Sequence, residues 1–304
     1  MSIIIISKMS ITISNKILMN LNGLVEAVVI KRPSKYIKTP YVADVKIDGS
    51  SEEILAHTAA LGCCGLADVG ASILMAPTPT SKSGNTKQKC SHRIYLAIIK
   101  NPSNCKCESE SETIVGIHPQ LGEQLCENAL KNNCLSKLSN IINYKRETTI
   151  YIEGKVDSRF DFTGVDSDGI PFIMEVKNVP LADYEDMTSK ERKKMDFSGR
   201  DWNSKVAYFP DGYRKKSTEP VSPRALKHIR ELTLIKKESK IRCLMCYVIQ
   251  RTDVDRFTAS VIDEEYREAV KEAINCGVEI ITLVVKWTRD GVAEFVRDDL
   301  PIVF

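Results

Sequence analysis

The stretch from residue 156 to residue 178, VDSRFDFTGVDSDGIPFIMEVKN, decides the fold expected for the second half of the chain. Asp161 lies in a first strand-like segment, a turn rich in Asp and Gly follows, and Glu175-Val-Lys177 lies in a second. Side chains two residues apart point to the same face of a strand, so Glu175 and Lys177 share a face. A reversal at 164–170 would bring Asp161 next to Glu175.

Two carboxylates and a lysine in this arrangement are typical of metal-dependent nucleic-acid phosphodiesterases. Carboxylates that converge on one point repel each other unless they share a cation or a proton. With Mg²⁺ or Mn²⁺, Asp161 and Glu175 would serve as metal ligands, and Lys177 would orient the attacking water. Glu-x-Lys alone also occurs on solvent-facing strands, so this interpretation depends on Asp161. Arg159 shares the strand face of Asp161 and is a natural phosphate contact.

Composition and charge set the limits of the interpretation. The chain has 304 residues, of which 43% are hydrophobic, enough for a core and two domains. The net charge of +3, from 43 basic and 40 acidic residues, does not by itself indicate a nucleic-acid binder. Basic clusters at Lys31-Arg32, 190–194 and 214–216 are either solvated loops or local contacts to nucleic acid.

The ten cysteines do not form the pattern of a secreted disulfide framework, and a reducing compartment is the better interpretation. Cys243 and Cys246 lie in an apolar run and are expected to be buried thiols. Residues 1–22 are expected to form a first strand or a tail, because Lys8 and Lys16 interrupt their apolar pattern. No later stretch reaches about 18 uninterrupted apolar residues. We expect a soluble, intracellular (cytoplasmic) protein without a membrane partner.

Two domains are expected, at residues 23–112 and 113–304. Short strands separated by turn signals predict a small all-β barrel in the first; they lie at 24–31, 41–47, 54–58, 71–75 and 93–100. Strands interleaved with helices predict an α/β domain with a central mixed sheet in the second; strands are expected at 148–163, 171–178, 241–250 and 278–285, and helices at 223–237 and 264–275.

A helix opens the second domain. His118-Pro119 provides an N-terminus with proline at or near the first helical position. Leu121, Leu125 and Ala129 follow at i, i+4 and i+8, which is the spacing of a buried helix face.

Several segments, in chain order, resemble the sugar fermentation stimulation protein family. They include VGIHPQLGEQLCENAL (115–130), SRFDF (158–162), MEVKNVPL (174–181), RALKHIREL (224–232) and IDEEYREAVKEAINCGVEII (262–281). The resemblance implies an N-terminal OB-like barrel followed by a restriction-endonuclease-like domain of the PD-(D/E)xK class. It also shows departures: the Pro-Asn-Thr-Gly expected after His57 is missing, and about twenty residues are inserted at 184–204.

The resemblance implies further site residues, each with an ordinary structural alternative. Glu127 would be a third metal ligand from the first helix, or an exposed helix residue. Lys227 and His228 would face the site and contact phosphate, although Lys227 and Glu231 also form an i,i+4 pair. Asp211 and Glu231 would support the metal ligands without binding the metal themselves, or Asp211 would cap a turn.

We therefore expect a metal-dependent nuclease that uses Mg²⁺ or Mn²⁺ and binds nucleic acid, DNA more than RNA. The barrel, with Lys31 and Arg32, would add contacts to the strand. Two alternatives stay open: a non-catalytic DNA-binding or regulatory protein of the same family, and a phosphoesterase acting on a small nucleotide. Zinc at Cys90-x-His92 or Cys105-x-Cys107 lacks the usual ligand spacing. The oligomeric state stays open, a dimer included.

Overall fold

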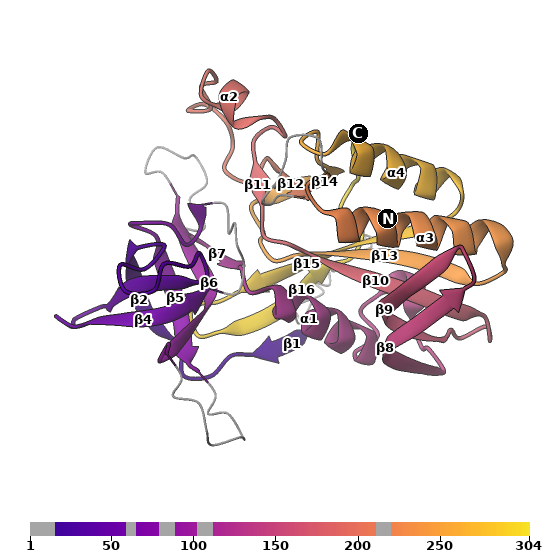
Figure 1. Cartoon of the computed structure of the whole chain (residues 1–304), viewed down its shortest axis with the longest axis horizontal. Helices are drawn as coiled ribbons and strands as arrows, with labels where there is room; N and C mark the ends of the chain where they lie inside the picture. The colour runs from indigo at the N-terminus through magenta and orange to yellow at the C-terminus, as the bar shows by residue number, and fades with distance from the viewer. Residues whose placement is uncertain (1–15, 59–64, 79–88, 102–111, 211–219) are drawn as a thin grey trace, which may run out of the picture.

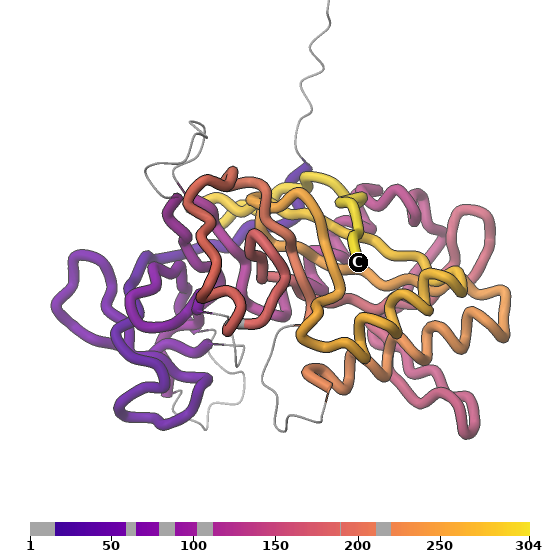
Figure 2. Tube along the Cα trace, turned by 90° about the horizontal axis from the view of Figure 1, so that it is seen from above, coloured from indigo at the N-terminus to yellow at the C-terminus, as the bar shows by residue number. Residues whose placement is uncertain are grey.

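The computed structural model describes residues 16–58, 65–78, 89–101, 112–210 and 220–304. A β-barrel lies at one end of an elongated molecule and a layered α/β domain at the other (Figure 1). The view from above shows the same separation, with the long helices at the end opposite the barrel (Figure 2). The chain therefore has the mixed α+β architecture that its sequence predicts, with the β domain first.

Five strands close the N-terminal barrel and a sixth extends it. In chain order they are β2 (Val25–Lys31), β3 (Val42–Ile47), β4 (Glu53–Thr58), β5 (Ser72–Pro77), β6 (His92–Lys100) and β7 (Glu112–Gly116). Their order in the sheet is β4-β3-β2-β5-β6-β7, and a parallel pairing of β4 with β6 closes the ring. The other pairings in this sheet are antiparallel. A closed five-stranded barrel of this kind is the OB-like domain that the resemblance implies.

A seven-stranded mixed sheet forms the centre of the second domain. Its order is β1-β16-β15-β13-β10-β9-β8, and only β10, β13 and β15 pair in parallel. The bounds are β1 (Ile17–Asn20), β8 (Asn143–Ile152), β9 (Val156–Val165), β10 (Pro171–Val179), β13 (Arg242–Ile249), β15 (Glu279–Trp287) and β16 (Val292–Arg297). The buried strand β13 reads as a nearly continuous apolar run because both of its faces are covered.

Helices cover both faces of this sheet. Helix α1 (Pro119–Lys131) packs on one face with a core that includes Phe162 and Leu244. Helices α3 (Pro223–Glu238) and α4 (Glu264–Asn275) pack on the other, with a core that includes Phe160 and Met245 (Figure 1). Alternate residues of β9 and β13 thus enter different cores, which makes the domain a three-layer sandwich.

Smaller elements complete the domain. A three-stranded sheet contains β11 (Ala182–Asp183), β12 (Lys205–Phe209) and β14 (Val254–Ala259), in that order. The single-turn helices are η2 (Ser136–Leu138) and α2 (Ser189–Arg192).

Helix α1 follows the sequence prediction closely. His118 is its N-cap, proline stands in its first turn, and Leu121, Leu125 and Ala129 are buried. Gly122 allows the helix to approach the sheet, because a Cβ atom added there would meet the Asn178 Cβ atom of β10 at 3.3 Å. This close approach places the first turn of α1 beside the strand that carries Glu175 and Lys177.

Other strand predictions need correction. The single strand expected at 148–163 is wrong: β8 and β9 form a hairpin there, and Gly154 at the turn has a positive φ of 68°. Glycine adopts such a φ without a steric cost. For the first 22 residues a strand or a tail was expected without a partner strand, and β1 pairs with β16 in the large sheet. The barrel sheet continues through β7, past residue 112.

Among the described residues, no helix is both long enough and apolar enough to span a membrane. Cys243 and Cys246 are buried in β13 and form no disulfide, so they are the core thiols that the apolar run predicts.

Candidate active site

Strands β9 and β10 bring Asp161 and Glu175 together. The strands pair antiparallel with Phe162 opposite Met174, so the next residues along, Asp161 and Glu175, are neighbours across the pair. Asp161 Oδ2 accepts a hydrogen bond of 2.7 Å from the backbone N–H of Val176. This contact fixes the Asp161 carboxylate against the strand that carries the Glu-x-Lys residues.

The Glu175 carboxylate is buried, and only one of its two oxygens is contacted by other side chains. Lys177 Nζ and His228 Nδ1 both contact Glu175 Oε1. The second oxygen, Glu175 Oε2, is buried and has no hydrogen-bond partner. His228 is itself buried against the Phe160 ring, with ring centroids 5.6 Å apart. Buried polar atoms are nearly always satisfied, so the orphaned Oε2 marks a place for a ligand.

The electrostatics of the pair also favour a cation. Burial, and then the negative charge of Glu175, raise the pKa of Asp161 to about 7, although Lys177 and the Val176 N–H act in the opposite direction. Burial alone would raise the pKa of Glu175 too, but His228 and Lys177 outweigh it and the pKa is lowered. A second negative charge is therefore costly here, and a bound cation is the alternative to a bound proton.

The carboxylates open into a pocket of about 200 Å³ between α1, β10 and the start of α3. Its lining residues are Pro119, Glu123, Asp161, Glu175, Val176, Lys177, Asn178 and Arg224. Glu123 comes from the first turns of α1, and Arg224 from the first turn of α3. The pocket thus joins three carboxylates, a lysine, an arginine and the N-termini of two helices.

The helix carboxylate of this pocket is Glu123 and not the expected Glu127. Glu127 accepts hydrogen bonds of 2.8 Å from Tyr144 and from Arg146, and it lies 3.0 Å from Lys131. Burial raises the pKa of Glu127, but these bonds more than compensate and lower it. Pro119 lines the pocket, so the start of the helix is nearest the site. Choosing the acid closest to that start would have identified Glu123.

Three further predicted residues lie outside the set that lines the pocket. Arg159 is exposed and lies 3.5 Å from Glu147. Lys227 donates to the backbone carbonyl of Asp157 and lies 3.7 Å from Glu231. Glu231 accepts a 3.0 Å hydrogen bond from the Asp157 N–H. Lys227 and Glu231 therefore attach α3 to the start of β9, whereas their neighbour His228 is in direct contact with the site.

The predicted barrel residues Lys31 and Arg32 are not among the residues that line the carboxylate pocket. Arg32 donates to the carbonyl of Pro40 at 2.9 Å and lies 3.5 Å from Asp68, and Lys31 is exposed at the end of β2. Asp211 lies outside the described residues.

Within the described ranges, no group of three or more His, Cys, Asp or Glu side chains is arranged to hold a metal ion. Cys90 is buried and free there, and Cys105 and Cys107 lie outside these ranges. Mg²⁺ usually keeps several waters and takes only one or two carboxylates. Asp161 and Glu175, with the orphaned Oε2, fit that partial ligand set.

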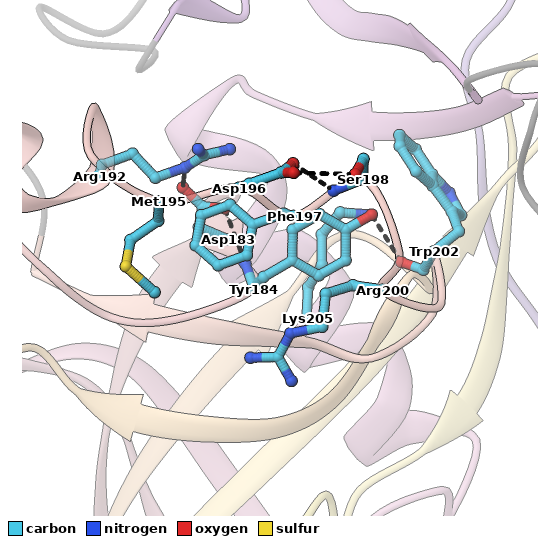
Figure 3. Close-up of a pocket in the computed structure, with 10 residues that line it drawn as sticks. All are labelled: Asp183, Tyr184, Arg192, Met195, Asp196, Phe197, Ser198, Arg200, Trp202 and Lys205. Atoms are coloured by element: carbon cyan, nitrogen blue, oxygen red, sulfur yellow. Dashed lines mark hydrogen bonds and ion pairs between the residues drawn. The ribbon is translucent and has the colours of Figure 1, made fainter.

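The inserted segment builds a second pocket, of about 550 Å³ (Figure 3). The rings of Tyr184 and Phe197 stack with centroids 5.3 Å apart, and the guanidinium of Arg192 covers Phe197 at 4.3 Å. Arg192 pairs with Asp183, and Trp202 Nε1 donates a 3.0 Å bond to a threonine of β7. The segment is thus packed and charge-paired, and it contacts the barrel sheet.

The fold and the site together define a restriction-endonuclease-like domain with a D…ExK cluster, preceded by an OB-like barrel. The family model described as the sugar fermentation stimulation protein RE domain, SfsA, matches residues 120–291. The chain belongs to this family.

A solved structure extends the likeness to almost the whole chain. It is SfsA of Pyrococcus furiosus in complex with Ca²⁺, which is 19% identical, with a TM-score of 0.67. The match covers 95% of this chain and 100% of the archaeal chain. At this identity the likeness shows a shared fold, barrel included.

Proposed function

We propose that this protein is a metal-dependent nuclease that hydrolyses phosphodiester bonds of nucleic acid, with DNA as the preferred polymer. The observation that carries the proposal is the Asp161–Glu175 pair, which lines a pocket with Lys177 and in which Glu175 Oε2 is buried without a hydrogen-bond partner. A cytoplasmic location belongs to the same proposal, since the six described cysteines are all free.

Asp161, Glu175 and the Val176 carbonyl would hold Mg²⁺ or Mn²⁺, and Glu123 would add negative charge beside them. When bound, the metal supplies a Lewis acid for a phosphate oxygen and lowers the pKa of a water molecule. The Ca²⁺ in the archaeal relative supports a divalent cation, since Ca²⁺ and Mg²⁺ both prefer oxygen ligands.

The chain's own side chains have separate tasks. Lys177 would orient the attacking water and balance negative charge that develops on the phosphate. His228 positions Glu175 through its Nδ1 contact. Arg224 and the N-termini of α1 and α3 provide positive potential where the scissile phosphate would lie.

The proposal is tested by incubating end-labelled single- and double-stranded DNA and RNA with the purified protein and Mg²⁺ or Mn²⁺. Cleavage that requires the metal and is stopped by EDTA is the expected result. The same gels give strand preference and the preference for DNA over RNA. A folded protein that binds Mn²⁺ in a calorimetric titration but cleaves none of these substrates would overturn the nuclease proposal.

One observation favours a non-catalytic DNA-binding protein as the second candidate. Glu175 Oε1 is already occupied by Lys177 and His228, and the described residues contain no complete three-ligand metal group. On this proposal the protein binds DNA without turnover. Its affinity for duplex DNA would then fall as the salt concentration rises. A plot of the logarithm of the binding constant against the logarithm of the salt concentration would have a slope of about −0.9 per phosphate contact.

Replacing Glu123 by Gln is expected to weaken Mn²⁺ binding and cleavage by about tenfold, the lower end of effects seen for groups behind metal ligands. The reason is its position: Glu123 lines the pocket and its charge acts on Asp161. Calorimetric titration with Mn²⁺ and initial cleavage rates measure the effect.

Glu127→Gln is the matched control, one turn along the same helix. Its carboxylate is engaged by Tyr144 and Arg146, so Mn²⁺ affinity should equal that of the parent. A larger loss of Mn²⁺ affinity in Glu127→Gln than in Glu123→Gln would show that Glu127, and not Glu123, is the carboxylate of α1 that supports the metal.

A further inference from the structure

Three nitrogen atoms at the junction of the barrel and α1 are buried without hydrogen-bond partners. They are His57 Nδ1, Arg93 Nε and His118 Nδ1. In native proteins nearly all buried polar side-chain atoms are satisfied, so three orphans in one neighbourhood call for an explanation. Each of the three nitrogens is able to donate a hydrogen bond, the imidazole ones in the corresponding tautomer.

The fold brings these groups together. His57 of β4 and Arg93 of β6 are direct partners in the parallel pairing that closes the barrel, so their side chains share a face. Tyr95 lies two residues beyond Arg93 on that face, and its ring stacks on His118 with centroids 5.0 Å apart. Tyr41 stacks on His57, with centroids 6.3 Å apart.

The surroundings of the three groups disfavour positive charge on the two imidazoles. Burial, then the positive charge of Arg93 and the proximity of His57, together lower the pKa of His118 to about 4. Burial and the charge of Arg93 also lower the pKa of His57. Within the described part of the chain, no carboxylate contributes to either shift. Arg93, a guanidinium that cannot lose its proton, thus lies beside two imidazoles that favour the neutral form, and each neutral imidazole still has one N–H to donate.

This cluster adjoins the candidate active site through consecutive residues. His118 is the N-cap of α1, and Pro119, the next residue, lines the carboxylate pocket. Consecutive Cα atoms are about 3.8 Å apart. A phosphate bound at His118 would also lie near the N-terminus of α1, where backbone N–H groups and the helix dipole favour anions.

We propose that His57, Arg93 and His118 form an oxyanion site for a phosphate group, and that a backbone phosphate of a nucleic-acid strand occupies it. The assignment of the occupant depends on the proposed function, whereas the oxyanion site itself does not. The rings of Tyr41 and Tyr95 flank the site and supply stacking surfaces for bases of an unpaired strand. The barrel would thus hold the strand next to the phosphate that reaches Asp161 and Glu175.

The test is the affinity of a fluorescently labelled single-stranded oligonucleotide, measured by anisotropy in EDTA so that no cleavage occurs. Arg93→Met is expected to weaken binding roughly tenfold, as for the loss of one charged hydrogen bond. It should also reduce the salt slope by about 0.7, the value for one phosphate contact on a single strand. Lys100→Met, an exposed cation on the same strand β6, is the control and should change affinity less than twofold.

His57→Gln is a second variant, because its Nδ1 atom has no partner to lose and folding should be preserved. Thermal unfolding of each variant confirms that it is folded. Equal oligonucleotide affinities for the parent, Arg93→Met and His57→Gln would overturn the assignment of a nucleic-acid strand to the site. This result is independent of catalysis, so a failure of cleavage in the presence of metal does not decide it.

Titration with inorganic phosphate distinguishes a nucleic-acid strand from free phosphate as the occupant of the site. If a nucleic-acid strand is the occupant, millimolar phosphate competes only weakly with the oligonucleotide. Arg93→Met then weakens the binding of both the oligonucleotide and phosphate. If phosphate alone raises the melting temperature of the parent but not of Arg93→Met, and the oligonucleotide binds both proteins equally, the strand assignment is wrong. No response to either ligand would overturn the proposal as a whole.

Discussion

Asp161→Asn is expected to reduce metal-dependent cleavage by at least about 10³-fold, which corresponds to roughly 4 kcal/mol of transition-state stabilisation. Asparagine has nearly the same shape and keeps an oxygen that accepts the Val176 N–H bond, so the local structure should persist. What is lost is the charge that would bind the metal. Initial rates with Mn²⁺ and calorimetric titration of Mn²⁺ measure the two consequences separately.

Asp157→Asn is the matched control, because Asp157 is an exposed carboxylate on the same strand. It should cleave at the parental rate. Without metal, the melting temperature of Asp161→Asn should equal or exceed that of the parent, since the substitution removes a partly buried charge beside Glu175. Parental cleavage by Asp161→Asn would show that the site assignment is wrong, and a large drop in melting temperature would show that Asp161 is structural.

Local pattern predicted the centre of the site well. Alternation placed Asp161, Glu175 and Lys177 on two strands, and the Asp- and Gly-rich segment between them predicted the reversal. The helix start at His118-Pro119 followed from capping rules alone. These features depend on neighbours in the sequence, which is why a single sequence was sufficient.

Features that depend on distant partners were missed. Nothing in residues 17–20 indicates that β1 pairs with β16 near the end of the chain. Glu123 and Glu127 lie on one side of the same helix, and Arg146 contacts both. Their roles are separated by the packing of Gly122 on β10 and by the contacts of Glu127 with Tyr144 and Lys131. The ion pair between Lys205, the first residue of β12, and Asp253 could not be predicted either, because the two residues lie 48 positions apart.

Asp253→Asn is expected to lower the free energy of unfolding by about 3–5 kcal/mol at pH 7. Asp253 is fully buried and accepts hydrogen bonds from Arg251 at 2.6 and 2.7 Å and from Lys205 at 2.8 Å. Lys205 also lies 3.2 Å from the ring centroid of Trp202. The carboxylate therefore joins β12 to the start of β14, and its loss removes the buried negative charge that both Arg251 and Lys205 contact. Urea unfolding of the parent and the variant measures the difference.

The pH dependence separates the charge of Asp253 from its shape. Burial by itself raises the pKa of Asp253, but Arg251 and Lys205 outweigh it and hold the pKa below its usual value. The stabilisation is therefore complete above the unfolded pKa of about 3.9 and is lost as the pH falls through the folded pKa. The difference in unfolding free energy between parent and variant should be constant from pH 7 to pH 5 and shrink below about pH 4.

Asp255→Asn is the control, because Asp255 is an exposed neighbour paired with Arg256. It should lower the free energy of unfolding by less than about 1 kcal/mol. Equal costs for the two variants would mean that the buried ion cluster contributes nothing to holding β12 and β14 together.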